Sequence, residues 1–183
     1  MSLDSVALLI EQIVITMMTT DVAEHAELAS LFEKLQLLEP GQESRQVESR
    51  IWEVWCNHEE PEAAEAMELV IAAFNQGSLT DANEKLNQMV DRWPTWAEAW
   101  NKRATLRFIE ERDLESMQDI ERTLQLEPRH FGAISGFGQL CMRVGDVDSA
   151  VIAFERAVSL NPNFEDIRKA IEYLERELPR TLH

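Results

Sequence analysis

The chain has 183 residues, 45% hydrophobic and 28% charged, which is enough for one helical domain with a continuous core. Its formal net charge is −17, and residues 1–60 alone contribute −9, from 12 acids and 3 bases. A surface of this sign repels phosphate groups, so nucleic acids and anionic membranes are not expected as partners. We interpret the acid excess first as a solubility feature of an acidic protein, with an acidic docking patch as the alternative.

Residues 5–18 are the most apolar stretch and predict a helix that is apolar on most sides. The stretch is too short to span a bilayer, and it lacks the basic segment and cleavage site of a signal peptide. We therefore expect a cytoplasmic protein, with a periplasmic location as the alternative if a leader sequence had been removed. A helix this apolar must be covered. It could pack on the first hairpin, lie in the groove of its own repeats, or form a homodimer through residues 5–18.

Two further helices are predicted over residues 22–38 and 43–58, because their large apolar side chains recur at helical spacing. We interpret them as a degenerate helix pair that stacks ahead of the repeats. Residues 1–60 are thus predicted to be an N-terminal helical extension, and residues 61–183 the repeat region.

The repeat region has a period of 34 residues, marked by Pro94, Pro128 and Pro162. A small residue recurs 12 residues before each proline, at Ala82, Ser116 and Ala150. A fixed period of this length is the signature of stacked helical hairpins. We expect hairpins over residues 63–96, 97–130 and 131–164, followed by a capping helix over residues 165–178.

The third hairpin shows the pattern most clearly. Its first helix is predicted to end at Gly145, because glycine takes the left-handed C-terminal position at low cost. Asp146 is then expected to cap the second helix. Three glycines fall in the first helix and are interpreted as sites of close helix packing: Gly132, Gly136 and Gly138. At the start of the second hairpin, Thr95 and Glu98 are predicted to form a capping box.

The spacing of Gly138, Ala150 and Pro162 in this unit resembles that of a tetratricopeptide repeat. The second unit departs from the family pattern at Glu111, where glycine is usual, so its turn is expected to be irregular with Asp113 as the cap. Most of the chain also resembles poorly characterised bacterial proteins that carry this repeat. The resemblance implies an all-α, right-handed superhelix of antiparallel helix pairs that binds proteins or peptides.

The first helices of such repeats line a concave groove, so the resemblance also implies which residues would contact a ligand. Six are expected to form a peptide-binding groove: Asn101, Thr105, Phe108, Gln139, Met142 and Arg143. Glu98 and Gly132 occupy further groove positions. In the first hairpin, Met67 and Ile71 occupy groove positions too, either for binding or packed under the N-terminal helices.

Chaperone-binding relatives hold a C-terminal carboxylate with lysine, asparagine and arginine side chains on these helices. The corresponding positions here are Met67, Ile71, Lys102, Gly132 and Gly136, and among them only Lys102 could serve. We therefore do not expect this chain to bind chaperone tails.

Catalytic and metal-binding patterns are weak. His130 lies at a repeat junction, where a hydrogen bond to a helix end is the simpler interpretation. The segment from Cys56 to Glu60 contains metal-capable residues but has no second half of a zinc site. Accordingly we expect no enzyme activity, no catalytic residues, no metal and no cofactor. The alternative to peptide binding is a structural role, in which the apolar N-terminal helix mediates self-association.

Overall fold

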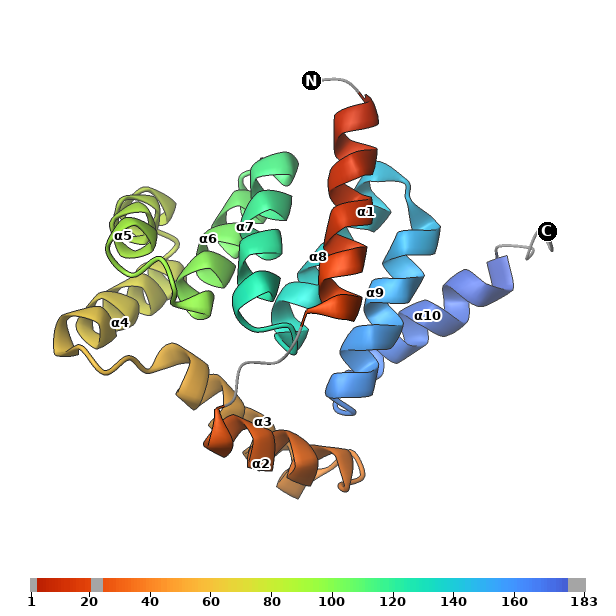
Figure 1. The fold of residues 1–183 in the computed structure, drawn as a ribbon, viewed down its shortest axis with the longest axis horizontal. Coiled ribbons are helices and arrows are strands. Elements are labelled where there is room, and N and C mark those ends of the chain that lie inside the picture. The colour runs from red at the N-terminus through yellow and green to blue at the C-terminus, as the bar shows by residue number, and fades with distance from the viewer. Residues whose placement is uncertain (1–2, 21–24, 178–183) are drawn as a thin grey trace.

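The computed structural model describes residues 3–20 and 25–177, and the elements within them are α-helices (Figure 1). The helices are α1 (Leu3–Thr19), α2 (Ala26–Gln36), α3 (Gln42–Cys56), α4 (Pro61–Gln76), α5 (Leu79–Arg92), α6 (Ala97–Ile109), α7 (Asp113–Leu126), α8 (Phe131–Val144), α9 (Val147–Leu160) and α10 (Glu165–Glu177). The predicted end of the last helix, residue 178, lies outside the described residues. In the described part of the chain, none of the helices has the length and apolar content needed to cross a bilayer.

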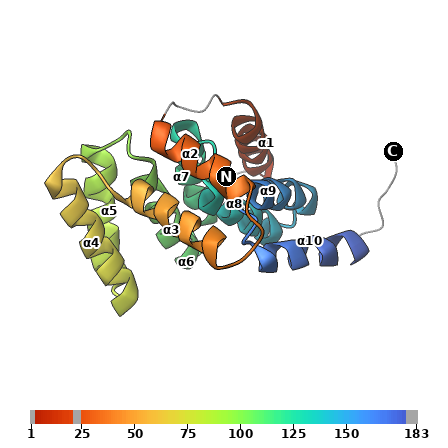
Figure 2. The same ribbon diagram turned by 90° about the horizontal axis from the view of Figure 1, so that it is seen from below.

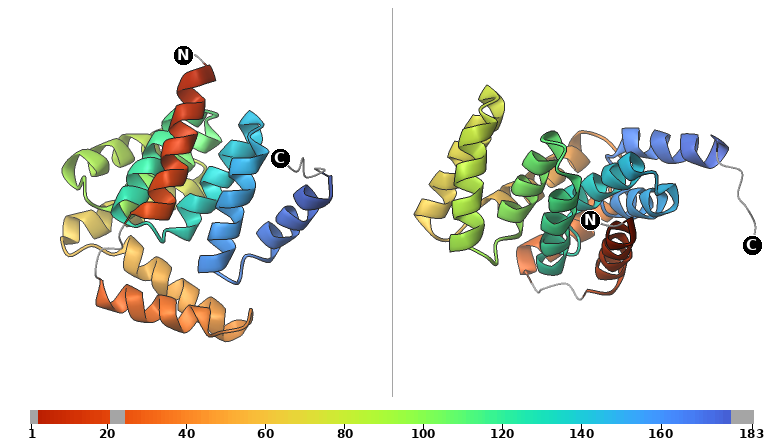
Figure 3. Two further views of the ribbon diagram at one scale, coloured as in Figure 1. Left: turned by 45° about the vertical axis from the view of Figure 1, so that its right-hand side comes forward. Right: turned by 90° about the horizontal axis from the view of Figure 1, so that it is seen from above.

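Helices α4–α5, α6–α7 and α8–α9 form three antiparallel hairpins that pack side by side, and α10 packs against α9 (Figures 1 and 3). Small residues let the two helices of a hairpin approach closely. Ala82 and Ala150 are fully buried, and a Cβ added at Gly138 would lie 2.5 Å from Phe154 Cε1. The fold predicted from the 34-residue period, an all-α superhelix of helix pairs, is therefore confirmed.

The turns inside the three hairpins share one backbone conformation. Gly77 and Gly145 end α4 and α8 in the left-handed region, with φ of 70° and 85°. Glu111 holds the same region between α6 and α7, with φ of 58°. The expectation of an irregular turn there was wrong: the backbone N–H groups of Glu111 and Arg112 bond the carbonyls of Phe108 and Arg107, as the equivalent N–H groups do at the Gly145 turn, although the left-handed conformation is costly for a glutamate. Asp113 is the first residue of α7 and Arg112 holds the cap position, which also corrects the predicted cap.

Helix α1 packs against α7 and α9, the second helices of two hairpins (Figures 1 and 2). Ile10, Ile13 and Met17 are buried there, whereas Leu8 and Ile15 on the opposite side are more than half exposed. One side of the apolar stretch is thus covered within its own chain, and the opposite side is not. It lies neither on the first hairpin nor along the first helices, where the groove is predicted.

The pair α2–α3 does not stack on α4–α5, so the predicted position was wrong. Instead, α3 crosses the N-terminal ends of α6 and α8 (Figure 1). Trp52 and Trp55 meet the rings of His130 and Phe131, with Trp55 stacked on His130 at 4.0 Å between ring centroids. At the other end of α3, Ser44 Oγ donates a hydrogen bond to Asn163 Oδ1 at 2.6 Å. Aromatic packing therefore determines where the extension docks, and hydrophobic periodicity in the sequence does not predict this position.

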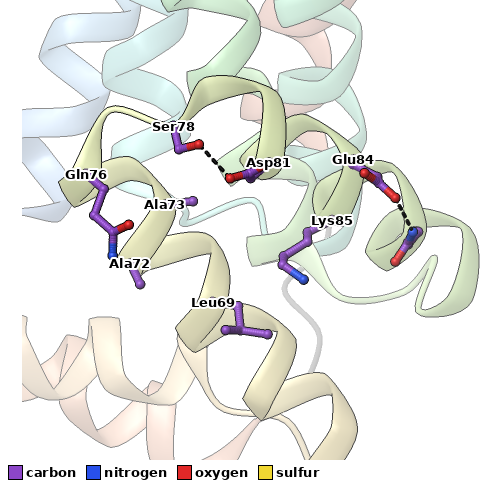
Figure 4. A pocket seen from close by; sticks show the side chains of 9 residues that line it. Leu69, Ala72, Ala73, Gln76, Ser78, Asp81, Glu84 and Lys85 are labelled. Carbon is purple, nitrogen blue, oxygen red and sulfur yellow. Dashed lines mark hydrogen bonds between the residues drawn. The ribbon is translucent and has the colours of Figure 1, made fainter.

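Because the pair lies elsewhere, the outer face of α4–α5 remains open. A hollow of about 400 Å³ lies along this face, with Leu69, Lys85 and Gln76 on its walls (Figure 4). Ser78 Oγ donates to Asp81 Oδ2 at 2.6 Å beside it. This side of the first hairpin is the end of the array in the described structure.

Candidate binding groove

A small pocket opens between α6 and α8, with α7 as its floor. Its volume is about 180 Å³, and eleven residues line it: Asn101, Ala104, Thr105, Phe108, Ser116, Ile120, Gly132, Ala133, Ser135, Gly136 and Gln139. Four of the six predicted groove residues therefore lie together around one cavity. Thr105 and Gln139 are exposed at its rim, whereas Asn101 is buried.

The position of Asn101 is set by a buried glutamate. Glu98 is fully buried and accepts hydrogen bonds from Asn101 Nδ2 at 2.9 Å, His130 Nε2 at 2.8 Å and Lys102 Nζ at 2.8 Å. Burial by itself would raise the pKa of Glu98, but the bonds from His130 and Lys102 outweigh it and hold this pKa well below its usual range. The glutamate is therefore ionised and acts only as an acceptor.

The hydrogen bonds around His130 identify its tautomer. Its Nδ1 accepts the backbone N–H of Ala133 at 3.1 Å and thereby caps α8. The proton must then be on Nε2, which donates to Glu98. A neutral imidazole satisfies both bonds, and Lys102 supplies the positive charge that balances Glu98. The predicted helix-end role of His130 is what the structure shows.

The predicted capping box of Thr95 and Glu98 was wrong. Trp96 holds the cap position of α6, and Glu98 points instead into the buried network described above. Sequence reasoning thus missed the most constrained side chain of the site. The available signal was a glutamate followed by two donors, Asn101 and Lys102, at i+3 and i+4, where helical side chains meet.

Helix α3 covers one end of the groove. Trp52 packs over Gly132, and a Cβ at that glycine would lie 2.5 Å from Trp52 Cη2. Lys102 Nζ lies 5.5 Å from the Trp52 ring centroid. Glu98 is therefore withdrawn from any ligand, and Gly132 lies at the end of the pocket that Trp52 covers.

The remaining two predicted groove residues lie outside the pocket lining. Arg143 Nη1 is 2.5 Å from Asp113 Oδ1 and also donates to the backbone oxygen of Phe108 at 3.2 Å. Its guanidinium lies 3.8 Å from the Phe108 ring centroid. Met142 is exposed on the next turn of α8. Arg143 thus joins α8 to α6 and α7 at the downstream end of the pocket.

A wider and more polar hollow, of about 570 Å³, lies where the end of α3 meets α4. Met67 and Ile71, the predicted groove positions of the first hairpin, are part of its wall together with Arg50 and His58. Met67 itself is buried. Arg50 is paired with Glu27 at 2.7 Å, so charged side chains of the extension close part of this wall.

Neither cysteine has the environment of a reactive thiol. Burial is the main cause that raises the pKa of Cys56 to about 11 and that of Cys141 to about 12. Cys56 Sγ also lies 3.8 Å from Glu98 Oε1. Among the described residues, no three histidine, cysteine or acidic side chains are grouped so that they could hold a metal ion.

No family model matches the chain. A TPR repeat-containing protein of Rhizobium etli is 36% identical over 93 residues, which are 51% of this chain and 46% of that protein. The match therefore spans about half the length of that relative. The "TPR" in its name abbreviates tetratricopeptide repeat.

Several solved structures are similar in fold. The first TPR of Spaghetti (RPAP3), bound to an HSP90 peptide, superposes with a TM-score of 0.57 and 19% identity over 60% of this chain and 87% of that one. MamA gives a TM-score of 0.57 and 22% identity over 61% of this chain and 66% of its own. The first TPR domain of human RPAP3 gives 0.55 and 19%, covering 60% and 86%. The repeat period, the hairpin packing and these similarities together show that the chain has the fold of a tetratricopeptide-type superhelix, preceded by an N-terminal helical extension.

Proposed function

We propose that this chain is a non-catalytic scaffold that binds a protein or peptide segment in the groove between α6 and α8. One observation carries the proposal: Asn101, Thr105, Phe108 and Gln139 surround a pocket that neither α1 nor α3 fills. The fold supports it, since one structural neighbour is a repeat domain bound to a peptide. A ligand would meet exposed Thr105 and Gln139 first and the apolar wall of Phe108 behind them.

The proposal is tested by selecting peptides from a phage-displayed library of random dodecapeptides against the full chain. A synthetic peptide from the selection is then titrated against wild type and Thr105→Arg. Thr105 is exposed and its hydroxyl bonds only the carbonyl of Asn101 one turn earlier, at 3.0 Å, so the arginine should leave the fold intact while blocking the pocket. We expect binding to fall by at least about tenfold, or about 1.4 kcal/mol.

The matched control is Thr80→Arg, because Thr80 is also an exposed helical threonine but lies on α5, away from the groove. It should bind like wild type. Equal loss in both variants, or none in either, would remove groove binding as the function. Circular dichroism of the three proteins verifies that each is folded.

A second candidate function, self-association, rests on the outer side of α1. Leu8, Ile15 and Met18 are 61–65% exposed there and lie within one stripe of the helix. We propose Leu8→Lys with Ile15→Lys as the test, measured by light scattering against wild type. Deleting the helix would be ambiguous, since it would also uncover α7 and α9. A monomer in wild type at all accessible concentrations would eliminate this candidate.

A further inference from the structure

We infer that the pocket between α6 and α8 anchors one uncharged aliphatic side chain from an internal peptide segment, and that Asn101 Oδ1 accepts a main-chain N–H of the same segment. This inference rests on the proposed function and specifies the class of ligand. It is carried by an unexplained glycine, by two polar side chains that line the pocket without a partner for one of their atoms, and by the charges around the pocket.

The glycine is Gly136, one of three in α8. Gly132 and Gly138 are required by packing, since an added Cβ would lie 2.5 Å from Trp52 or Phe154. At Gly136 the nearest atom to such a Cβ is Ile120 Cδ1, at 3.7 Å, which is an ordinary contact. Alanine would therefore fit, and it would favour the helix by about 1 kcal/mol. What glycine at 136 provides is space in the pocket, whose wall it forms.

Two polar side chains on the same wall are buried yet incompletely bonded. Asn101 is 6% exposed and Ser135 is 8% exposed. Asn101 Nδ2 donates to Glu98, but neither Asn101 Oδ1 nor Ser135 Oγ has a hydrogen-bond partner within residues 3–20 and 25–177. Neither atom is among the fully buried side-chain atoms that lack a partner, so both are open to solvent through the pocket, where a ligand group can take the place of water.

The orientation of the Asn101 amide is fixed, and this determines what it can recognise. Ionised Glu98 can only accept, so Nδ2 must face it and Oδ1 must face the pocket. The free atom is therefore an acceptor, which matches a peptide N–H. Ser135 Oγ can donate to the carbonyl of the same segment.

Size and charge define the rest of the ligand. A volume of about 180 Å³ is below the roughly 300–1,000 Å³ of small-molecule sites, so the pocket suits one side chain and not a cofactor. None of the eleven lining residues is charged. The two nearby cations are engaged, Lys102 by Glu98 and Arg143 by Asp113. Within the described part of the chain, the pocket therefore offers a carboxylate neither of these cations unpaired, which favours an internal segment over a chain terminus.

The anchor is tested with Gly136→Leu, which fills the pocket from within. The probe is the synthetic dodecapeptide from the phage selection, in free-acid and C-terminally amidated forms. We expect Gly136→Leu to weaken binding by at least about tenfold and Gly136→Ala to weaken it less while raising the melting temperature. Both peptide forms should bind alike, and replacing the peptide's conserved aliphatic residue with aspartate should abolish binding.

The contact with Asn101 is tested by methylating each backbone nitrogen of the peptide in turn. Methylation at one of these nitrogens should weaken binding to wild type by at least about fivefold. Methylation at the same nitrogen should leave the affinity for Asn101→Ala unchanged. Equal sensitivity of both proteins at every position would overturn the contact.

The outcomes separate the two proposals. If Thr105→Arg abolishes binding but Gly136→Leu and Gly136→Ala bind like wild type, the groove is used and the anchor inference is wrong. A strong loss on amidation would show terminal-carboxylate recognition and overturn the internal-segment inference. If Gly136→Leu does not fold, two other results refute the anchor inference together. Folded Gly136→Ala would bind the peptide with wild-type affinity, and the peptide with aspartate in place of its aliphatic residue would still bind. If Thr105→Arg also binds normally, or no peptide is selected, the proposed function itself fails.

Discussion

Replacing Glu98 with glutamine tests whether the buried network holds the second hairpin and the extension together. Glutamine keeps the shape but brings an NH₂ group into a site where the neighbours His130, Asn101 and Lys102 are all donors. The least costly arrangement turns this NH₂ toward Lys102, which is 23% exposed and can move into solvent.

The expected loss follows from that arrangement. A hydrogen bond to a charged group contributes about 1.5–3 kcal/mol, and removing one member of a buried ion pair costs about 3–5 kcal/mol. Partial exposure of Lys102 places Glu98→Gln near the lower end, at about 2–3 kcal/mol. For a chain of this size this corresponds to a melting temperature lowered by about 4–12 °C.

Thermal unfolding followed by circular dichroism measures the effect, with a double-mutant cycle as the control. In Lys102→Met the apolar stem that covers Trp52 remains but the ammonium is gone. The double variant should therefore be less destabilised than the sum of the two single variants. A loss below about 1 kcal/mol for Glu98→Gln, or strict additivity, would show that the network does not stabilise the fold as the geometry implies.

Four further predictions concern the turns, the packing and the titrating groups. Glu111→Gly should stabilise the chain by about 1 kcal/mol in urea unfolding, because it relieves a left-handed φ of 58°. Gly138→Ala should destabilise it by about 1–3 kcal/mol, since the methyl would overlap Phe154. Stability should also fall in acid, because folding lowers the pKa of Glu98 from 4.5 to about 2. The contribution of Glu98 to the free energy of unfolding is fully present above about pH 4.5 and is lost as the pH falls toward 2, and Glu98→Gln should lack this part of the pH dependence. Raised pKa values at Cys56 and Cys141 predict slow reaction with a thiol reagent at pH 8 in the folded chain and rapid reaction in urea.

The sequence predicted what depends on local, periodic signals. The proline spacing located the hairpins, and Gly145 was correctly predicted to end α8, because a glycine in the left-handed region acts within one turn of the chain. Asp146 was correctly predicted as the cap of α9, where its Oδ1 accepts the N–H of Ser149 at 3.1 Å. Four of the predicted groove residues line one pocket, because repeats of fixed length place equivalent positions on the same surface.

What could not be predicted depends on contacts between distant segments. The docking site of α3 is determined by aromatic contacts of Trp55 with His130 and by the space above Gly132, and hydrophobic periodicity reports only that α3 has an apolar side. The role of Glu98 was missed because its partner His130 lies 32 residues away. Arg143 was predicted to contact a ligand, and its bond to Asp113 was not foreseen because the two residues are 30 positions apart in sequence.

These contacts connect the extension to the groove in one continuous chain. Trp55 stacks on His130, His130 donates to Glu98, and Glu98 holds the amide of Asn101 with its acceptor toward the pocket. Removing the ring that supports His130 would loosen Glu98 and with it Asn101. The extension therefore does more than cover apolar surface, because its tryptophan ring packs on the histidine that bonds Glu98. Because Glu98 can only accept, the amide of Asn101 keeps this orientation for as long as the glutamate stays in place.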